Sequence, residues 1–170
     1  YQKISAVSGG FAGSVDDGDN FGTSLTALGY LDGDSAPELA VGTVREDDGG
    51  ANRGAVWVLS LNPDGTIAAQ SKISSTAGGF AGGLGDADYF GISVAALPDL
   101  DGDGVAELAV GAIGDDDGGS DRGAVWILFL NPDATVKSEV KISQTAGGFA
   151  GPIADNDSFS FGFGGADGLG

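Results

Sequence analysis

The fold is decided by a nine-residue stretch that occurs twice: Arg-Gly-Ala-Val-Trp-Ile-Leu-Phe-Leu at 122–130 and Arg-Gly-Ala-Val-Trp-Val-Leu-Ser-Leu at 53–61. After its first two residues, the stretch at 122–130 is apolar at every position. Such a run is typical of a β-strand that is covered on both faces. Because one small sheet cannot cover both faces of its own strand, the pattern predicts sheets that stack on one another.

The spacing of this stretch, 69 residues from 53 to 122, runs through the rest of the chain. Lys-Ile-Ser occurs at 3–5, 72–74 and 141–143, and Glu-Leu-Ala-Val-Gly occurs at 38–42 and 107–111. The chain therefore contains two complete repeats and the opening of a third.

Within one repeat, apolar and turn residues alternate with the period of short strands. Strands are expected at 90–97, 107–111, 123–130 and 135–143, and no segment has the length and period of a helix. We therefore predict an all-β fold of four-stranded antiparallel blades. Radial stacking of such blades forms a β-propeller, and four to eight blades are typical. Two repeats and a fragment predict an incomplete ring.

The repeat boundaries divide the chain into four parts. The first part is the last strand of a preceding blade with its connecting loop, and the last part is a connecting loop with the first strand of a third blade. Between them lie the first blade, and a loop with the second blade. The predicted boundaries are 1–20, 21–75, 76–143 and 144–170.

The composition excludes several classes of function. The chain of 170 residues has no Cys, His or Met, so a Ser-His or Cys-His nucleophilic centre, a disulfide framework and a Cys/His zinc site are excluded. A net charge of −18 disfavours binding to nucleic acid, and no apolar stretch is long enough for membrane insertion. The lack of Met favours a mature or excised segment.

The strongest candidate site is the acidic loop between the first two strands of the second repeat. Asp99, Asp101 and Asp103 stand at loop positions 1, 3 and 5, followed by the Val105 carbonyl at position 7 and Glu107 at position 9. An all-oxygen, multi-carboxylate set suits Ca²⁺. The alternative is an acidic hairpin without metal, which mutual repulsion of the carboxylates disfavours.

The first repeat has a weaker version of this loop. Asp32, Asp34, the Ala36 carbonyl and Glu38 remain, but Tyr30 replaces the leading Asp. Metal binding here is left open, and a lower affinity is expected if it occurs.

Other acidic segments favour structural roles. Three Asp-x-Asp pairs are expected to cap turns rather than hold a second cation, and two acidic triplets are expected to form solvated turns with a following Arg as counter-ion. The pairs are Asp17/Asp19, Asp86/Asp88 and Asp155/Asp157, and the triplets are 46–48 and 115–117, followed by Arg53 and Arg122. Trp57 and Trp126 are expected in the core between blades.

These residues together resemble the FG-GAP repeats of integrin α-chain propellers and of long bacterial surface proteins. The matching pieces are Phe21-Gly22, Phe90-Gly91, the loop at 99–107 and the strands at 39–42 and 108–111. The bacterial branch is the most similar, through the Asp-Asp-Gly-Gly and Arg-Gly-Ala-Val-Trp runs. The resemblance implies a Ca²⁺-stabilised blade array that is extracellular or on a cell surface, with metal in the hairpin loops.

Three hypotheses of function follow. The first is a secreted structural module whose blades associate with further copies as a ring or filament, because residues 1–5 and 158–163 resemble unpaired strands. The second is a calcium-dependent adhesion or recognition segment that binds a protein or glycan. The third is an enzyme, which we do not expect because no constellation of carboxylates breaks the repeat.

Overall fold

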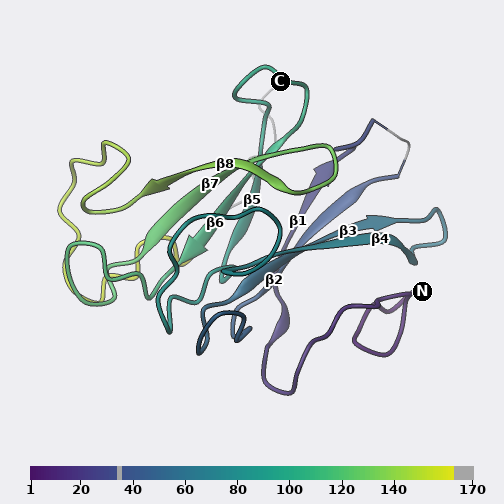
Figure 1. Ribbon diagram of the computed structural model, residues 1–170, viewed down its shortest axis with the longest axis horizontal. Helices are drawn as coiled ribbons and strands as arrows, with labels where there is room; N and C mark the ends of the chain where they lie inside the picture. Colours follow the sequence, from purple (N-terminus) through teal and green to yellow (C-terminus); the bar gives the residue numbers. More distant parts are fainter. Residues whose placement is uncertain (34–35, 163–170) are drawn as a thin grey trace.

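The computed structural model describes residues 1–33 and 36–162 (Figure 1). The described residues form two four-stranded antiparallel sheets, in the order β1-β2-β3-β4 and β5-β6-β7-β8, and contain no helix. This confirms the predicted all-β fold of four-stranded blades, which here do not close into a ring. The strands are β1 (Phe21–Gly29), β2 (Glu38–Thr43), β3 (Ala55–Leu61), β4 (Ile67–Ile73), β5 (Val94–Leu97), β6 (Glu107–Ala112), β7 (Ala124–Leu130) and β8 (Val136–Ile142).

The two blades diverge from their first strands, β1 and β5, which lie against each other (Figure 1). The backbone N–H of Ala96 on β5 donates to Thr26 Oγ1 on β1, with a donor–acceptor distance of 3.3 Å. The registers repeat as well, because Val41 pairs with Trp57 in the first blade and Val110 pairs with Trp126 in the second. The sequence repeat is therefore a structural repeat.

Each blade has two apolar faces, which we name by their direction along the chain. The leading face points toward a preceding blade and the trailing face toward a following one. Alternate residues of the two middle strands divide between the faces, as the pleat of a strand requires. The leading face is Leu39, Val41, Trp57 and Leu59 in the first blade and Leu108, Val110, Trp126 and Leu128 in the second; the trailing face is Ala40, Val56 and Val58, then Ala109, Val125 and Ile127.

The main core lies between the two blades. There the trailing face of the first blade packs against the leading face of the second. Phe90 is fully buried in this core, and its ring centroid lies 5.1 Å from that of Phe80, which in turn makes an edge contact with Trp126. The expectation that Trp126 belongs to the core between blades is therefore confirmed. Trp57 occupies the same position on the outer leading face.

The segment that contains Phe90 and Gly91 differs from the prediction, which placed it in a strand of residues 90–97. β5 begins only at Val94. Phe90 instead forms a bridge with Gly54 of the first blade, and its N–H donates to Arg53 O at 2.9 Å. The preceding blade therefore draws this segment out of its own sheet, whereas the equivalent Phe21 stays within β1.

Two predicted terminal strands also differ from the structure. Residues 1–5 contain no strand, only an isolated bridge between Ser5 and Ser8. Residues 158–162 form turns and bends, and Phe163 lies outside the described residues. Residues 1–5 have no neighbouring strand among the described residues, and a strand needs one for its backbone hydrogen bonds. The last segment is held differently, because the N–H of Phe159 donates to Arg122 O at 2.9 Å, as that of Phe90 does to Arg53 O.

Candidate metal centre

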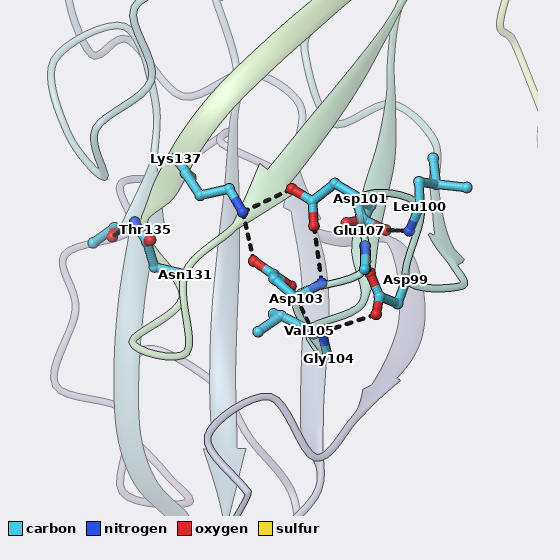
Figure 2. Close-up of polar contacts among 11 residues, drawn as sticks. Asp99, Leu100, Asp101, Asp103, Gly104, Val105, Glu107, Asn131, Thr135 and Lys137 are labelled. Atoms are coloured by element: carbon cyan, nitrogen blue, oxygen red, sulfur yellow. Dashed lines mark hydrogen bonds and ion pairs between the residues drawn. The ribbon is translucent and has the colours of Figure 1, made fainter.

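The loop that connects β5 to β6 is shaped by its own carboxylates (Figure 2). The N–H groups of Gly102 and Gly104 donate to the two carboxylate oxygens of Asp99, at 2.7 and 2.8 Å. The N–H of Val105 donates to Asp103 Oδ1 at 2.9 Å. Gly102 and Gly104 have φ values of 83° and 89°, which residues with a Cβ rarely adopt. These bonds curl the loop so that its side chains converge.

The convergence brings four carboxylates to one place. One oxygen from each of Asp99, Asp101, Asp103 and Glu107 lies within 4.8 Å of the others. Three of these residues are exposed, whereas Glu107 is 1% exposed at the base of the loop. The donor set consists of oxygens alone and includes four carboxylates, which fits Ca²⁺ better than a metal that needs nitrogen or sulfur ligands.

Burial is the main cause that raises the pKa of Glu107, and the charges of Asp101, Asp99 and Asp103 raise it further. The N–H of Leu100 opposes this shift by donating to Glu107 Oε2 at 2.7 Å. The loop therefore concentrates negative charge around a buried carboxyl, a field that a cation would relieve.

The structure adds one cationic residue that the sequence analysis missed. Lys137, near the start of β8, places its Nζ 2.7 Å from Asp101 Oδ2 and also contacts Asp103 Oδ2 (Figure 2). One signal in the sequence pointed to this residue: the equivalent position of the first repeat is Ala68. Only the second repeat, which has the stronger candidate loop, therefore has a lysine at this position.

The first-repeat loop has only part of its predicted ligand set in the described residues. Asp34 lies outside them. Glu38 Oε2 accepts the Leu31 N–H at 2.7 Å, and Glu38 Oε1 accepts the Ser60 hydroxyl at 2.9 Å. The second repeat has Phe129 in place of Ser60, so its glutamate is not engaged by this hydroxyl. A metal at Asp32, Ala36 and Glu38 stays a prediction.

The second residue of each Asp-x-Asp pair caps a turn, as we expected. The pattern is the same in all three copies: a carboxylate oxygen accepts the N–H of the residue three positions earlier. The bonds join Asp16 N to Asp19 Oδ2 at 2.6 Å, Gly85 N to Asp88 Oδ2 at 2.8 Å and Ala154 N to Asp157 Oδ2 at 2.7 Å.

The counter-ions of the acidic triplets differ from the prediction. Arg53 does not neutralise its own triplet, because its Nε lies 2.8 Å from Asp86 of the next repeat unit. Lysine takes that role: Lys72 Nζ lies 3.1 Å from Glu46 Oε1 and 2.8 Å from Asp48 Oδ2, and it also stands over the Trp57 ring. The arginines therefore form ion pairs with the next repeat unit, and the lysines form ion pairs with the triplet of their own repeat.

The carboxyl of Asp88 gives the junction between the blades a dependence on pH. Asp88 is 5% exposed, and burial raises its pKa to about 6, with the charge of Asp115 adding to the effect. A raised acid pKa means that the folded state holds a proton that the unfolded state releases. The contribution of Asp88 to the free energy of unfolding is therefore fully present below its ordinary pKa of 3.8 and is lost as the pH rises through about 6.

We expect Asp88→Asn to remove this dependence while keeping an oxygen for the Gly85 N–H. The melting temperatures of the variant and the wild type should differ least near pH 4, diverge as the pH rises from about 4 to about 6 and keep a constant difference above that, with the variant more stable. Thermal unfolding followed by circular dichroism across this range would measure the difference. If the melting temperatures of the two proteins changed with pH in the same way, the raised pKa of Asp88 would be contradicted.

Comparison with known proteins places this architecture in a family. Residues 90–128, which include Phe90, the acidic loop, β6 and the start of β7, match the sequence model of the FG-GAP repeat. This chain belongs to the FG-GAP repeat family. The described residues contain no helix of the length and apolar character that a membrane crossing requires.

The FG-GAP chain is also similar to integrin α subunits. It is 38% identical to integrin alpha-5 of Xenopus laevis over 96 residues, which are 56% of this chain and 9% of the integrin. It is 32% identical to integrin alpha-PS2 of Drosophila melanogaster over 129 residues, 74% of this chain and 8% of the integrin. The chain spans less than a tenth of the length of these relatives. Membership of a bacterial branch stays a prediction.

Proposed function

We propose that this FG-GAP chain is an extracellular, calcium-binding structural module whose blades associate with further copies of the chain. The integrin relatives support a propeller-type module for adhesion or recognition on the outside of a cell. The acidic loop at 99–107 supports calcium, because its four carboxylates converge. FG-GAP repeats in integrins are structural or adhesion modules, which supports a role without catalysis.

The observation that carries the association is the repetition of the blade faces. In the core between the blades, a trailing face covers a leading face. The first blade has a second leading face on its outer side, which Phe11 and Val15 partly cover, and the second blade has a second trailing face, which Phe159 partly covers. A trailing face of one molecule can therefore pack on a leading face of another as the two blades do only where one of these covering segments moves aside.

Leu25 lies on the outer leading face at a position that is covered in the core between the blades. Its equivalent in the second blade, Val94, is 6% exposed in the core between the blades, whereas Leu25 is 62% exposed. Leu25 lines an apolar hollow together with Ile4, Phe21, Leu39 and Leu59. Burial of this hollow under another trailing face would give the free energy of association, at about 25 cal/mol per Å² of apolar area.

Such a contact joins two different faces and is therefore head-to-tail. A head-to-tail contact closes into a ring if the rotation between copies permits it and otherwise continues as a filament. Four to eight blades are usual in a propeller, so a closed ring of two-blade chains would hold about two to four copies. The charge of −18 opposes association, and bound calcium would reduce that repulsion.

Two variants with one altered face each would test the contact. Leu25→Asp places a charge on the leading face, and Val140→Asp places one on the trailing side, where Val140 is 45% exposed and pairs with Ile127. Each variant alone should be monomeric in sedimentation velocity with about 1 mM calcium. Mixed in equal amounts, they should form a dimer and nothing larger, because one pair of intact faces remains.

The mixture also separates this model from others. A symmetric contact between like faces would instead leave one of the two variants dimeric on its own, and mixing would form no new dimer. A wild-type chain that stays monomeric at high concentration would overturn self-association. Both variants change exposed residues, so their circular dichroism spectra should match that of the wild type.

The second candidate function is an adhesion or recognition segment within a longer propeller. The similarity to integrin α subunits favours it. In that case the outer faces are covered by blades of the same polypeptide, and the partner is a protein or glycan. A monomeric wild-type chain whose stability still depends on calcium would favour this candidate over the first.

A further inference from the structure

The position of Lys137 follows from the topology of the second blade. In the antiparallel order β5-β6-β7-β8, the β5–β6 loop and the β7–β8 turn lie at the same end of the sheet. Lys137 is the second residue of β8, immediately after that turn, and its side chain extends from β8 across to the acidic loop (Figure 2). The contact thus joins segments that are 34 residues apart in the sequence.

The lysine contacts the carboxylate oxygens that the loop backbone leaves available. Asp101 Oδ1 accepts the N–H of Asp103 at 3.3 Å, and Asp103 Oδ1 accepts the N–H of Val105. Lys137 Nζ contacts the other oxygen, Oδ2, of each of the two aspartates. A calcium ion at this loop would need the same outward oxygens, so the ammonium and the metal compete for them.

The lysine can leave without disturbing the sheet. Its side chain is 38% exposed, and exposed ion pairs of this kind contribute little net free energy. Lys72 in the first repeat and Lys141 in the second differ from Lys137, because they are equivalent residues. Each forms an ion pair with the acidic triplet of its own repeat and lies over the tryptophan of that repeat. Lys137 has no counterpart in the first repeat, which has Ala68 at this position.

We infer that Lys137 is a built-in counter-ion that holds the loop at 99–107 in its metal-free form and weakens its affinity for calcium by competition. This inference rests on the proposed calcium site. When calcium binds, the ammonium moves from Asp101 and Asp103 into solvent and the divalent ion takes their outward oxygens. The lysine thereby shifts the calcium concentration at which the loop fills.

The test compares calcium binding by the wild type, Lys137→Met and Lys3→Met, using isothermal titration with calcium chloride at about 0.15 M salt. Lys3→Met is the matched control: it removes the same charge, and the structure gives Lys3 no ion pair with any described residue. Lys137→Met should lower the dissociation constant about 2- to 5-fold, the range expected when a weak exposed ion pair no longer competes. Lys3→Met should change it much less.

Thermal unfolding supplies a second readout. In EDTA, Lys137→Met should melt below the wild type, because its carboxylates repel one another without a counter-ion. In saturating calcium this deficit should vanish. Equal affinities for all three proteins, or equal gains in both variants, would overturn the role of Lys137. Failure of every protein to bind calcium would instead refute the calcium site itself.

Discussion

Replacement of Phe90 by Ala is expected to lower the free energy of unfolding by about 3–5 kcal/mol. Phe90 is fully buried between the two blades, against Phe80, and its backbone bonds to Arg53 of the first blade. Its removal leaves a cavity at the point where the blades meet. Because the blades share one core, we expect the loss to appear in one unfolding transition rather than in two. Urea denaturation followed by tryptophan fluorescence would measure it.

Phe21 is the matched control for this substitution. It occupies the equivalent position on the outer leading face, where its ring lies 5.0 Å from Phe11 but is only partly buried. Phe21→Ala should therefore cost about 1–2 kcal/mol in the monomer. If Phe90→Ala does not fold, Phe90→Leu keeps most of the volume and should still cost more than Phe21→Leu. Equal costs at the two positions would mean that the blades do not share a core.

Addition of about 10 mM calcium is expected to stabilise the chain by about 1.4–2.7 kcal/mol, if the loop at 99–107 has the dissociation constant of ~10⁻⁴–10⁻³ M that is common in extracellular modules. For a chain of this size, that free energy corresponds to a rise in melting temperature of about 3–10 °C. EDTA should reverse the rise. The physical reason is that calcium binds the folded loop and relieves the repulsion among its carboxylates.

A double variant identifies the loop as the origin of this effect. Asp101→Asn with Asp103→Asn removes two of the converging carboxylates and should abolish the calcium-dependent rise. Asp17→Asn, at an exposed position in the first Asp-x-Asp pair, changes the charge without touching the loop and should leave the rise intact. A rise that survives in the double variant would place the calcium elsewhere.

The blades and the loop could be predicted because their signals are local. The apolar stretch at 122–130 predicts a strand that is covered on both faces, and its copy 69 residues earlier predicts that a second sheet supplies the cover. The loop was visible because Asp99, Asp101, Asp103 and Glu107 stand at alternating positions of a tight turn, so the backbone alone brings their carboxylates together.

The features that the prediction missed depend on contacts between distant segments. Lys137 reaches the loop only because of the order of strands in the second sheet, which no local pattern encodes. Arg53 pairs with Asp86 rather than with its own triplet because the next repeat unit brings that carboxylate within reach. Residues 1–5 have the sequence of a strand but form none, since a strand depends on its neighbour as much as on its own side chains.

A crystal structure grown with about 10 mM calcium is the most direct test of the metal centre. We predict an ion in the loop about 2.3–2.6 Å from oxygens of Asp99, Asp101 and Asp103, the usual range for calcium, with the Lys137 side chain turned away from Asp101 and Asp103. A loop that stays without an ion at this concentration, with Lys137 Nζ still between the two aspartates, would contradict the account.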